Sequence, residues 1–476
     1  MSRRPDDLAL RASFARPGRE VARVAVPVSL EFMLILGLSV VNQIIVGGLG
    51  DIAVAAVGFA NSIQFVPFFV LGALGTSTSI LVARAYGAKR EKELNKVVSA
   101  ALLTAATVGI LVGLPFVIWP HQIFSALGAS TSVVDTGSSY LALAMASLFI
   151  GLLAQVFSGI LRSADHARSP MVATIVTGII QVPLSIVLVY GWGSIPALGV
   201  FGAAIAMVIV AVLRVSIMAI QTFGVFRIAA WELPGKRVEW REVMKPMIVL
   251  AAPMGLTAGF WSGGNFLYNV VVQQLGDAAL AAVQIVQNLE GFFFVGSLGL
   301  FNAVTALAGR AVGADNGPLA AAWVSYVKRI GIYTGIAFGI LYGLSAFAVP
   351  VLYPKVPEIV IWYSVVGIIV NAVFQPIKVR NSILGAAVLP SGNDVRGVLI
   401  GDFISPFIFG LPLSILFGLI LPFGIYGVFA GRLCEEIVKN IIFSWRDRRL
   451  NWVEVAKKHN MVNPLGDDPV EAIIQA

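Results

Sequence analysis

Residues 49–57 read L-G-D-I-A-V-A-A-V, and 226 positions later residues 275–283 read L-G-D-A-A-L-A-A-V. The same offset continues without a gap to the far end of the matching region, where Arg84 is paired with Arg310. A match of this length at one fixed offset indicates an internal duplication. The chain therefore consists of two related halves.

The composition indicates a membrane protein. The chain is 58% hydrophobic and only 12% charged, and its mean hydropathy is +0.88. Soluble domains carry about 25% charged residues, so this chain lacks the polar surface that keeps a soluble protein in solution. In an integral membrane protein, a duplicated half is typical of transporters in which one half moves against the other around a central binding site.

Hydrophobic runs long enough to cross about 30 Å of hydrocarbon follow one another along the chain. The runs are continuous, whereas the strands of a membrane barrel alternate in polarity at every second residue, so we predict helices. The expected fold class is an all-α polytopic membrane protein with twelve transmembrane helices, six in each half. The predicted helices cover residues 24–47, 53–83, 97–119, 138–161, 170–191, 201–223, 247–275, 279–308, 326–349, 360–384, 398–421 and 425–443.

Basic residues are distributed unevenly among the predicted loops. Lys and Arg concentrate in the even-numbered loops and at both termini, whereas the odd-numbered loops hold a single basic residue, Lys355. This asymmetry predicts that both termini lie in the cytoplasm and that the protein is a multi-pass protein of the inner cell membrane. The net charge of +8 is then a topology signal, and no nucleic-acid partner is expected.

The same boundaries give the expected domain organisation. Each half should form a six-helix lobe, and the most charged internal stretch should link the two lobes. The predicted segments are a cytoplasmic N-terminal segment (1–23), an N-lobe (24–226), a cytoplasmic linker (227–245), a C-lobe (246–445) and a cytoplasmic tail (446–476).

Small residues mark the turns of both halves. Gly50 and Gly276 are each followed by Asp, as in a tight turn before a helix. Gly87 and Gly313 follow the predicted second and eighth helices, and we expect them to be helix C-caps. The G-V-F-G sequence of residues 199–202 recurs as G-I-Y-G, beginning at Gly424. The duplication therefore extends to the last helix of each half.

Four motifs occur together in this order, and they resemble the multidrug and toxic compound extrusion (MATE) family in its bacterial DinF-like or NorM-like type. They are the L-G-D-x-A-x-A-A-V turn, the R-A-x-G-A that closes the second helix, L-R-S-A-D-H-A-R-S-P-M at 161–171, and G-V-x-G-A-A-I-A from residue 199. The resemblance covers residues 24–443. It implies two six-helix lobes around a V-shaped central cavity, and export of organic, often cationic, molecules driven by H⁺ or Na⁺.

The sequence departs from the family at positions where members carry functional polar residues. The helix-one Asp of many members is Asn42 here, and the helix-seven Glu of some members is Trp261. The Asn and Asp of helix five in bacterial and archaeal members are Gln181 and Ser185. The coupling mechanism therefore cannot be carried over residue by residue.

Acidic residues inside the predicted helices are the candidates for binding a coupling ion, because an acid at the centre of a bilayer costs about 2.5–3.5 kcal/mol on insertion scales. Three acids qualify by position: Glu290, Asp402 and Glu31. Glu290 lies nearest the middle of its helix. Gln284, Gln287 and Glu290 follow each other at intervals of three residues and should form one polar stripe on this helix. The counterpart of Glu290 in the first half is the neutral Gln64, so we expect ion binding to belong to the C-lobe if it uses this polar stripe.

Further polar and aromatic residues are candidates for lining the substrate cavity. We interpret Arg214 as a residue that snorkels to the interface, and Lys378 as one near a helix end. The cavity candidates are Asn42, Gln64, Gln155, Gln181, Ser185, Trp261, Asn265, Tyr268, Gln284, Gln287, Asn371 and Gln375.

These features favour a secondary active multidrug exporter that works as a monomer by H⁺ or Na⁺ antiport, with the lipid bilayer and a small organic substrate as its partners. A flippase for a lipid-linked oligosaccharide is the first alternative, but it needs a cationic cavity, and the sequence shows no arginine or lysine cluster in mid-membrane. An uncoupled, divergent exporter is the second. A single cysteine and three scattered histidines argue against an enzyme, a metal site or a cofactor.

Overall fold

The structure is a computed structural model that describes residues 14–128, 130–354, 356–421 and 423–461, without the side chains of residues 65, 66 and 459–461. The predictions for Lys355, and for residues 1–13 and 462–476 of the two terminal segments, lie outside the described residues. Within the described residues the chain is helical, apart from its turns, the irregular segment 226–236 and one isolated bridge between Trp192 and Ile195.

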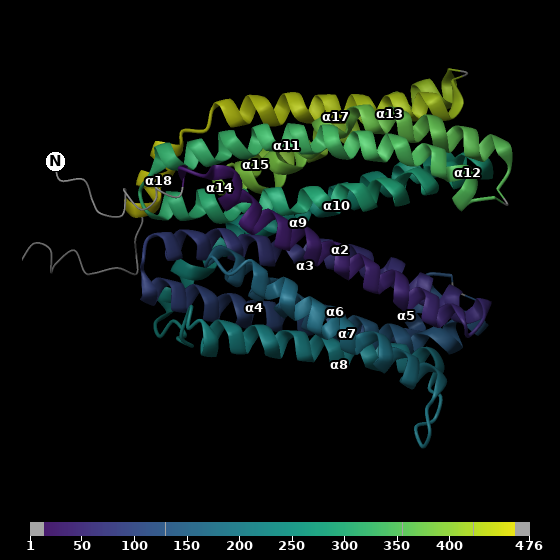
Figure 1. The fold of residues 1–476 in the computed structure, drawn as a ribbon, viewed down its shortest axis with the longest axis horizontal. Coiled ribbons are helices and arrows are strands. Elements are labelled where there is room, and N and C mark those ends of the chain that lie inside the picture. Colours follow the sequence, from purple (N-terminus) through teal and green to yellow (C-terminus); the bar gives the residue numbers. More distant parts are fainter. Residues whose placement is uncertain (1–13, 129, 355, 422, 462–476) are drawn as a thin grey trace, which may run out of the picture. The chain divides into compact units, whose positions relative to one another are not determined.

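In the part of the chain that the structure describes, six long helices belong to each half of the sequence (Figure 1). The first half holds α2 (Pro17–Gly47), α3 (Asp51–Gly87), α4 (Glu91–Ile118), α6 (Thr131–Ser163), α7 (Arg168–Tyr190) and α8 (Gly199–Ala219, continued as a π-helix over Ile220–Val225). The second half holds α9 (Arg237–Gln273), α10 (Asp277–Gly313), α11 (Gly317–Ser345), α13 (Glu358–Ile383), a helix built from α15 (Val395–Phe403) and α16 (Leu411–Ile415) with π-helical turns, and α17 (Gly424–Arg448). The short helices are α5 (Pro120–Ala126), α12 (Val349–Leu352), α14 (Leu389–Ser391) and α18 (Trp452–Met461).

Eleven helical segments in the described part of the chain are long and apolar enough to cross a membrane. The twelfth long helix, α17, has 25 residues and several charged side chains. Large apolar side chains such as Ile110 (63%) and Val373 (70%) are exposed, as expected for surfaces that face lipid. The all-α, twelve-helix fold class is therefore confirmed.

The described helices form two compact units. We call Leu30–Ala251 the N-unit, and residues 14–29 together with Ala252–Asn460 the C-unit. The boundaries fall inside α2 and α9, so the first turns of each of these helices belong to the other half's unit. In the C-unit, Ser29 Oγ donates to the Gly296 carbonyl at 2.8 Å.

The first turns of α9 lie in the N-unit, where Lys96 Nζ is 3.1 Å from Glu239 Oε2. Helix α9 begins at Arg237, ten residues before the predicted start at residue 247. Part of the expected linker is therefore a regular helix, because Val243 and Met247 are buried in the apolar core of the N-unit.

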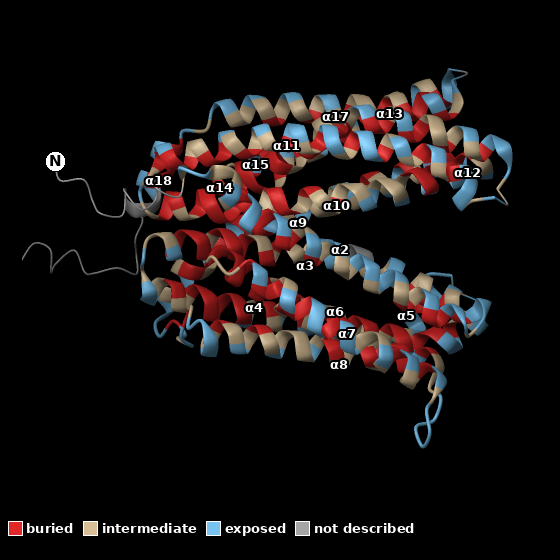
Figure 2. Ribbon diagram, in the orientation of Figure 1, coloured by how far each residue is buried: buried red, intermediate tan, exposed pale blue. Residues whose placement is uncertain are grey.

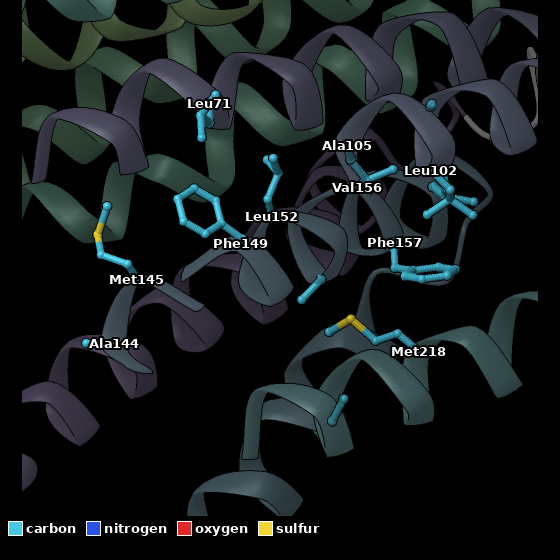
Figure 3. Packing of buried hydrophobic residues seen from close by; sticks show 14 of the residues in the cluster. Leu71, Leu102, Ala105, Ala144, Met145, Phe149, Leu152, Val156, Phe157 and Met218 are labelled. Carbon is cyan, nitrogen blue, oxygen red and sulfur yellow. The ribbon is translucent and has the colours of Figure 1, made fainter. Parts of the chain in front are cut away.

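Helix α6 is the central element of the N-unit and packs against α3, α4 and α8. Figure 3 shows part of this core, with Leu71 of α3, Phe149 and Leu152 of α6, and Met218 of α8 among the labelled side chains. Small residues allow the close approach, since a Cβ at Gly113 of α4 would lie 2.1 Å from the Phe149 ring. Figure 2 colours the buried residues of the helices red.

The core of the C-unit is built mainly from α10, α11 and α13. Tyr342 Oη of α11 donates to the Val286 carbonyl of α10 at 2.9 Å. A Cβ at Gly339 of α11 would lie 2.6 Å from the Ala372 carbonyl oxygen of α13. Glycine at such positions brings the helix backbones close together, as is usual in membrane bundles.

The backbone repeats the duplication seen in the sequence. Gly50 and Gly276 have φ values of +102° and +99°, and Gly199 and Gly424 have φ values of +57° and +54°. Each of these glycines stands immediately before a helix or at its first residue. Because side chains with a Cβ rarely adopt such angles, the turns require glycine at the same places in both halves.

The C-terminal turns of α3 and α10 correct one prediction. Both helices include Gly87 and Gly313 as their last residues, and the left-handed residues are instead Lys89 (φ +56°) and Asp315 (φ +57°). The amide of Arg90 reaches back to the Ala85 carbonyl at 3.2 Å, which closes the turn. The C-caps are therefore Ala88 and Ala314, one residue after the predicted Gly87 and Gly313.

Candidate functional site

The N-unit contains a cavity of about 360 Å³, which we call the N-unit cavity. Helices α2, α3, α6, α7 and α8 contribute to its wall. Five of the predicted site residues line it, namely Glu31, Asn42, Gln64, Gln155 and Gln181. Ser185 is also buried, at 1% exposure, but it does not line the cavity.

Helical periodicity explains how these residues reach one wall. On α2, Glu31, Ile35, Leu38 and Asn42 all line the cavity, and their spacing of three and four residues places them on one face of the helix. Much of the remaining wall is apolar, with Leu71 and other leucine, phenylalanine and alanine side chains. The cavity is therefore an apolar space with polar groups at defined points, which is typical of sites for small organic ligands.

A buried ion cluster occupies part of the wall. The two oxygens of the Glu31 carboxylate accept from different arginines, Oε2 from Arg162 Nη2 at 2.7 Å and Oε1 from Arg214 Nη2 at 2.8 Å. Ser158 Oγ also donates to Oε1, at 3.4 Å. Glu31 is 1% exposed and the Arg162 side chain 8%. The guanidinium of Arg162 lies 5.4 Å from the centre of the Phe32 ring.

This cluster corrects two predictions about arginine. Arg162 belongs to the last turn of α6 and is buried, although the predicted helix ended one residue earlier, at 161. Arg214 lies well inside α8 and bonds to Glu31, so it does not snorkel. Two arginines and one carboxylate therefore meet at the wall of the N-unit cavity, an arrangement that the sequence interpretation did not include.

The C-unit holds a second polar network around Glu290 of α10. Glu290 Oε1 accepts from Lys378 Nζ of α13 at 2.5 Å, and the same ammonium donates to Asn371 Oδ1 at 2.6 Å. Asn371 Nδ2 donates to the Gly367 carbonyl at 2.8 Å, which fixes the amide. Lys378 and Asn371 are seven residues apart on one face of α13. Lys378 is therefore the partner of Glu290, and its interpretation as a helix-end residue was incomplete.

Asp402 belongs to a third cluster, on the face of α15 that meets α17. Lys439 Nζ of α17 lies 3.4 Å from Asp402 Oδ1 and 3.4 Å from Glu435 Oε1. Tyr268 Oη of α9 donates to Glu435 Oε2 at 2.7 Å. Each of the three predicted coupling acids thus has a cationic partner in the structure.

The charged face of α17 is the main feature that the sequence interpretation missed. Arg432, Glu435, Glu436 and Lys439 follow each other at spacings of three, one and three residues, which places all four on one side of a helix. This pattern inside a predicted transmembrane span was a readable signal. Arg432 Nη2 donates to Asn265 Oδ1 at 3.0 Å, so α17 also reaches a predicted cavity residue.

The remaining candidates of the C-unit have different environments. Gln375 is fully buried, and neither its amide nitrogen nor its amide oxygen has a hydrogen-bond partner among the described residues. The amide nitrogen of Gln287 is also buried and has no hydrogen-bond partner among the described residues. Trp261 is 45% exposed, and Gln284 is also exposed. Gln284 therefore does not share the buried environment that the predicted polar stripe implied.

Twelve long helices, an internal duplication and buried polar clusters inside apolar helix bundles define a polytopic membrane transporter. A family model described as MatE matches residues 27–187 and 253–416, one segment in each half. The matched segments make up more than half of the chain. The chain belongs to the MATE family of transporters.

Curated relatives agree with this assignment. The chain is 22% identical over 432 residues to the uncharacterized transporter YisQ of Bacillus subtilis, covering 90% of this chain and 93% of the relative. It is 29% identical over 350 residues to the probable multidrug resistance protein NorM of Bradyrhizobium diazoefficiens, covering 68% of this chain and 70% of the relative.

Solved structures show the same fold. An outward-facing multidrug resistance MATE family transporter of the MOP superfamily has a TM-score of 0.82 at 22% identity, covering 93% of this chain and 97% of that one. A MOP superfamily transporter from Pyrococcus furiosus has a TM-score of 0.81 at 21% identity, covering 92% and 97%.

Proposed function

We propose that the protein is a secondary active multidrug exporter that moves amphiphilic organic molecules, cationic ones among them, out of the cell by H⁺ or Na⁺ antiport. In this proposal it acts as a monomer by alternating access, in the inner membrane with both termini in the cytoplasm. Family membership and relatives named as probable multidrug resistance proteins support the multidrug part.

The observation that carries the antiport part is the Glu290–Lys378 pair. A carboxylate inside an apolar helix bundle is costly, so a retained one is a functional candidate. Its oxygen is 2.5 Å from the Lys378 ammonium, and a coupling cation that binds Glu290 must therefore compete with that ammonium. In one arrangement of α10 and α13 the Lys378 ammonium binds Glu290, and in the other the coupling cation binds it. An ion drives a conformational change only to the extent that it binds one arrangement more tightly than the other.

Dye efflux from everted membrane vesicles tests this role of Glu290. Glu290→Gln removes the charge at nearly constant volume, and we expect it to abolish the dependence of efflux on the ion gradient. Asp447→Asn is the matched control, because Asp447 also pairs with a lysine of the C-unit, Lys328, at 2.6 Å but lies in the last turn of α17. Full ion-dependent efflux in Glu290→Gln would refute Glu290 as the coupling site. Imposing a pH gradient and a Na⁺ gradient separately on proteoliposomes identifies the ion.

One observation favours a second function, the translocation of a lipid-linked oligosaccharide. Such a flippase must accommodate a pyrophosphate, and the N-unit cavity presents two arginines with one carboxylate. Proteoliposomes containing a fluorescent polyprenyl-pyrophosphate oligosaccharide test this function. Translocation of the lipid without any dye export would replace the exporter proposal, and dye export without translocation would exclude the flippase.

A further inference from the structure

The N-unit cavity carries a net positive charge. Among its lining residues, the side chains that are charged at neutral pH are Glu31, Arg162 and Arg214. One carboxylate balances one guanidinium, so the formal charge of the wall is +1. A charge held inside an apolar bundle without a counter-charge is costly. A ligand that brings one negative charge into the cavity would remove this imbalance.

The two arginines differ in how accessible they are to such a ligand. The Arg162 side chain is 8% exposed and is held between Glu31 and the Phe32 ring. The Arg214 side chain is 21% exposed and lines the cavity. A guanidinium has five N–H donors. The bond to Glu31 uses one from Nη2, and Arg214 Nε is buried without a hydrogen-bond partner among the described residues. Arg214 therefore has donors left that an anion could accept from.

The rest of the wall suits the body of an amphiphile. A volume of about 360 Å³ is in the range of sites for small organic molecules. Apolar side chains from several helices form much of the surface, and the amides of Gln64, Gln155 and Gln181 add neutral polar points. Gln64 Nε2 is buried and has no hydrogen-bond partner among the described residues, so this cavity-lining side chain carries an unused donor.

We propose that the N-unit cavity binds amphiphiles that carry one singly charged anionic group, a carboxylate or a phosphodiester. Arg214 contacts the anion, whereas Arg162 and Glu31 are positioning residues that hold the Arg214 guanidinium at the wall. The proposal rests on the exporter function in one respect only, namely that the bound molecule is the exported one. The anionic group that Arg214 contacts could belong to a soluble acid or to the headgroup of an anionic lipid.

A matched pair of fluorescent ligands tests the charge preference on the full-length protein in neutral detergent. N-dansyl-6-aminohexanoic acid and its methyl ester share one aromatic body and differ in the negative charge. Because hydrogen bonds to charged groups are strong, we expect the acid to bind the wild-type protein at least about tenfold more tightly than the ester. Equal affinities for acid and ester would overturn the proposal.

Variants assign the preference to Arg214. Arg214→Gln should reduce the acid's affinity about tenfold and leave the ester's unchanged, while Arg214→Lys should restore part of the preference. Unchanged ester binding also shows that the variant is folded. Arg168→Gln is the matched control, because Arg168 is exposed at the first residue of α7 and does not line the cavity. A full preference for the acid in Arg214→Gln would contradict the assignment.

Nanodiscs identify the source of the anion. If the occupant is a lipid headgroup, adding phosphatidylglycerol to phosphatidylcholine nanodiscs lowers the apparent affinity for the dansyl acid. If the occupant is a soluble acid, the affinity stays constant, and either result supports the anionic site. The exporter proposal and the anionic site can fail separately. If the wild-type protein shows no ion-dependent dye efflux but binds the acid more tightly than the ester, the exporter proposal fails and the anionic site stands. Conversely, ion-coupled efflux of dyes with equal binding of acid and ester overturns the anionic site alone.

Discussion

Replacing Glu31 should destabilise the N-unit more than replacing either of its arginine partners. Glu31 is 1% exposed, and its two oxygens bond to different guanidinium groups, at 2.7 Å and 2.8 Å. Glu31→Ala leaves both arginines without their counter-charge. Breaking a buried ion pair by removing one partner costs about 3–5 kcal/mol. We expect the free energy of unfolding to fall by an amount near the upper end of this range, because two pairs are broken by one substitution.

Of the two arginine variants, the one at the more buried arginine should lose more of the free energy of unfolding. Arg162→Met removes the partner that is 8% exposed and leaves Glu31 bonded to Arg214. Arg214→Gln removes the partner that is 21% exposed, and its cost should be close to that of a partly exposed ion pair, about 1 kcal/mol. The expected order of destabilisation is therefore Glu31→Ala, then Arg162→Met, then Arg214→Gln.

Unfolding of the purified variants in detergent, followed by tryptophan fluorescence and by circular dichroism, measures this order. The double variant Glu31→Ala with Arg214→Gln completes a cycle with the two single variants. In the Glu31→Ala background the Arg214→Gln substitution should cost less or stabilise, because it removes a guanidinium that has lost the Glu31 carboxylate as its counter-charge. The reasoning is refuted if Glu31→Ala unfolds under the same conditions as the wild-type protein, or if the Arg214 substitution costs more.

Two further outcomes follow from the C-unit. Lys378→Met leaves Glu290 without its ammonium partner, so we expect lower thermal stability in Na⁺-free buffer and partial recovery on adding NaCl, with choline chloride as the control. Equal recovery in both salts would contradict a cation site there. Gly299→Ala places a Cβ 2.0 Å from the Ala25 carbonyl oxygen, and overpacking of this kind costs about 1–3 kcal/mol. Gly263→Ala, with open space around its Cβ, should be neutral, and equal unfolding of the two glycine variants would contradict this packing.

The sequence predicted the helices because the relevant physics is local. A span that must satisfy its own backbone hydrogen bonds in lipid has to be helical, and its length follows from the thickness of the hydrocarbon. The duplication added the glycine turns, which recur at Gly50 and Gly276 with nearly equal φ values. The largest differences lie at helix starts, where α9 and α11 begin ten and nine residues before the predicted residues 247 and 326. The charged first turns of α9 look like a linker in sequence and are helical in the structure.

The candidate site was less predictable, although part of it was visible in the sequence. The spacing of Arg432, Glu435, Glu436 and Lys439 already indicated a charged face inside a membrane helix. Glu290, Asp402 and Glu31 were identified because an acid in an apolar run is rare and costly. Their role in ion coupling stays a prediction.

The amino-acid sequence by itself determined the class of the protein, the number of long helices, the duplication and the acids that merit testing. Only the tertiary structure decided which cation each acid meets. Glu31 pairs with arginines 131 and 183 residues away, on two other helices. Such a pairing depends on how far each helix is rotated and shifted against its neighbours. That arrangement is set by the packing of small and large side chains at many contacts together, and no local pattern in the sequence records it.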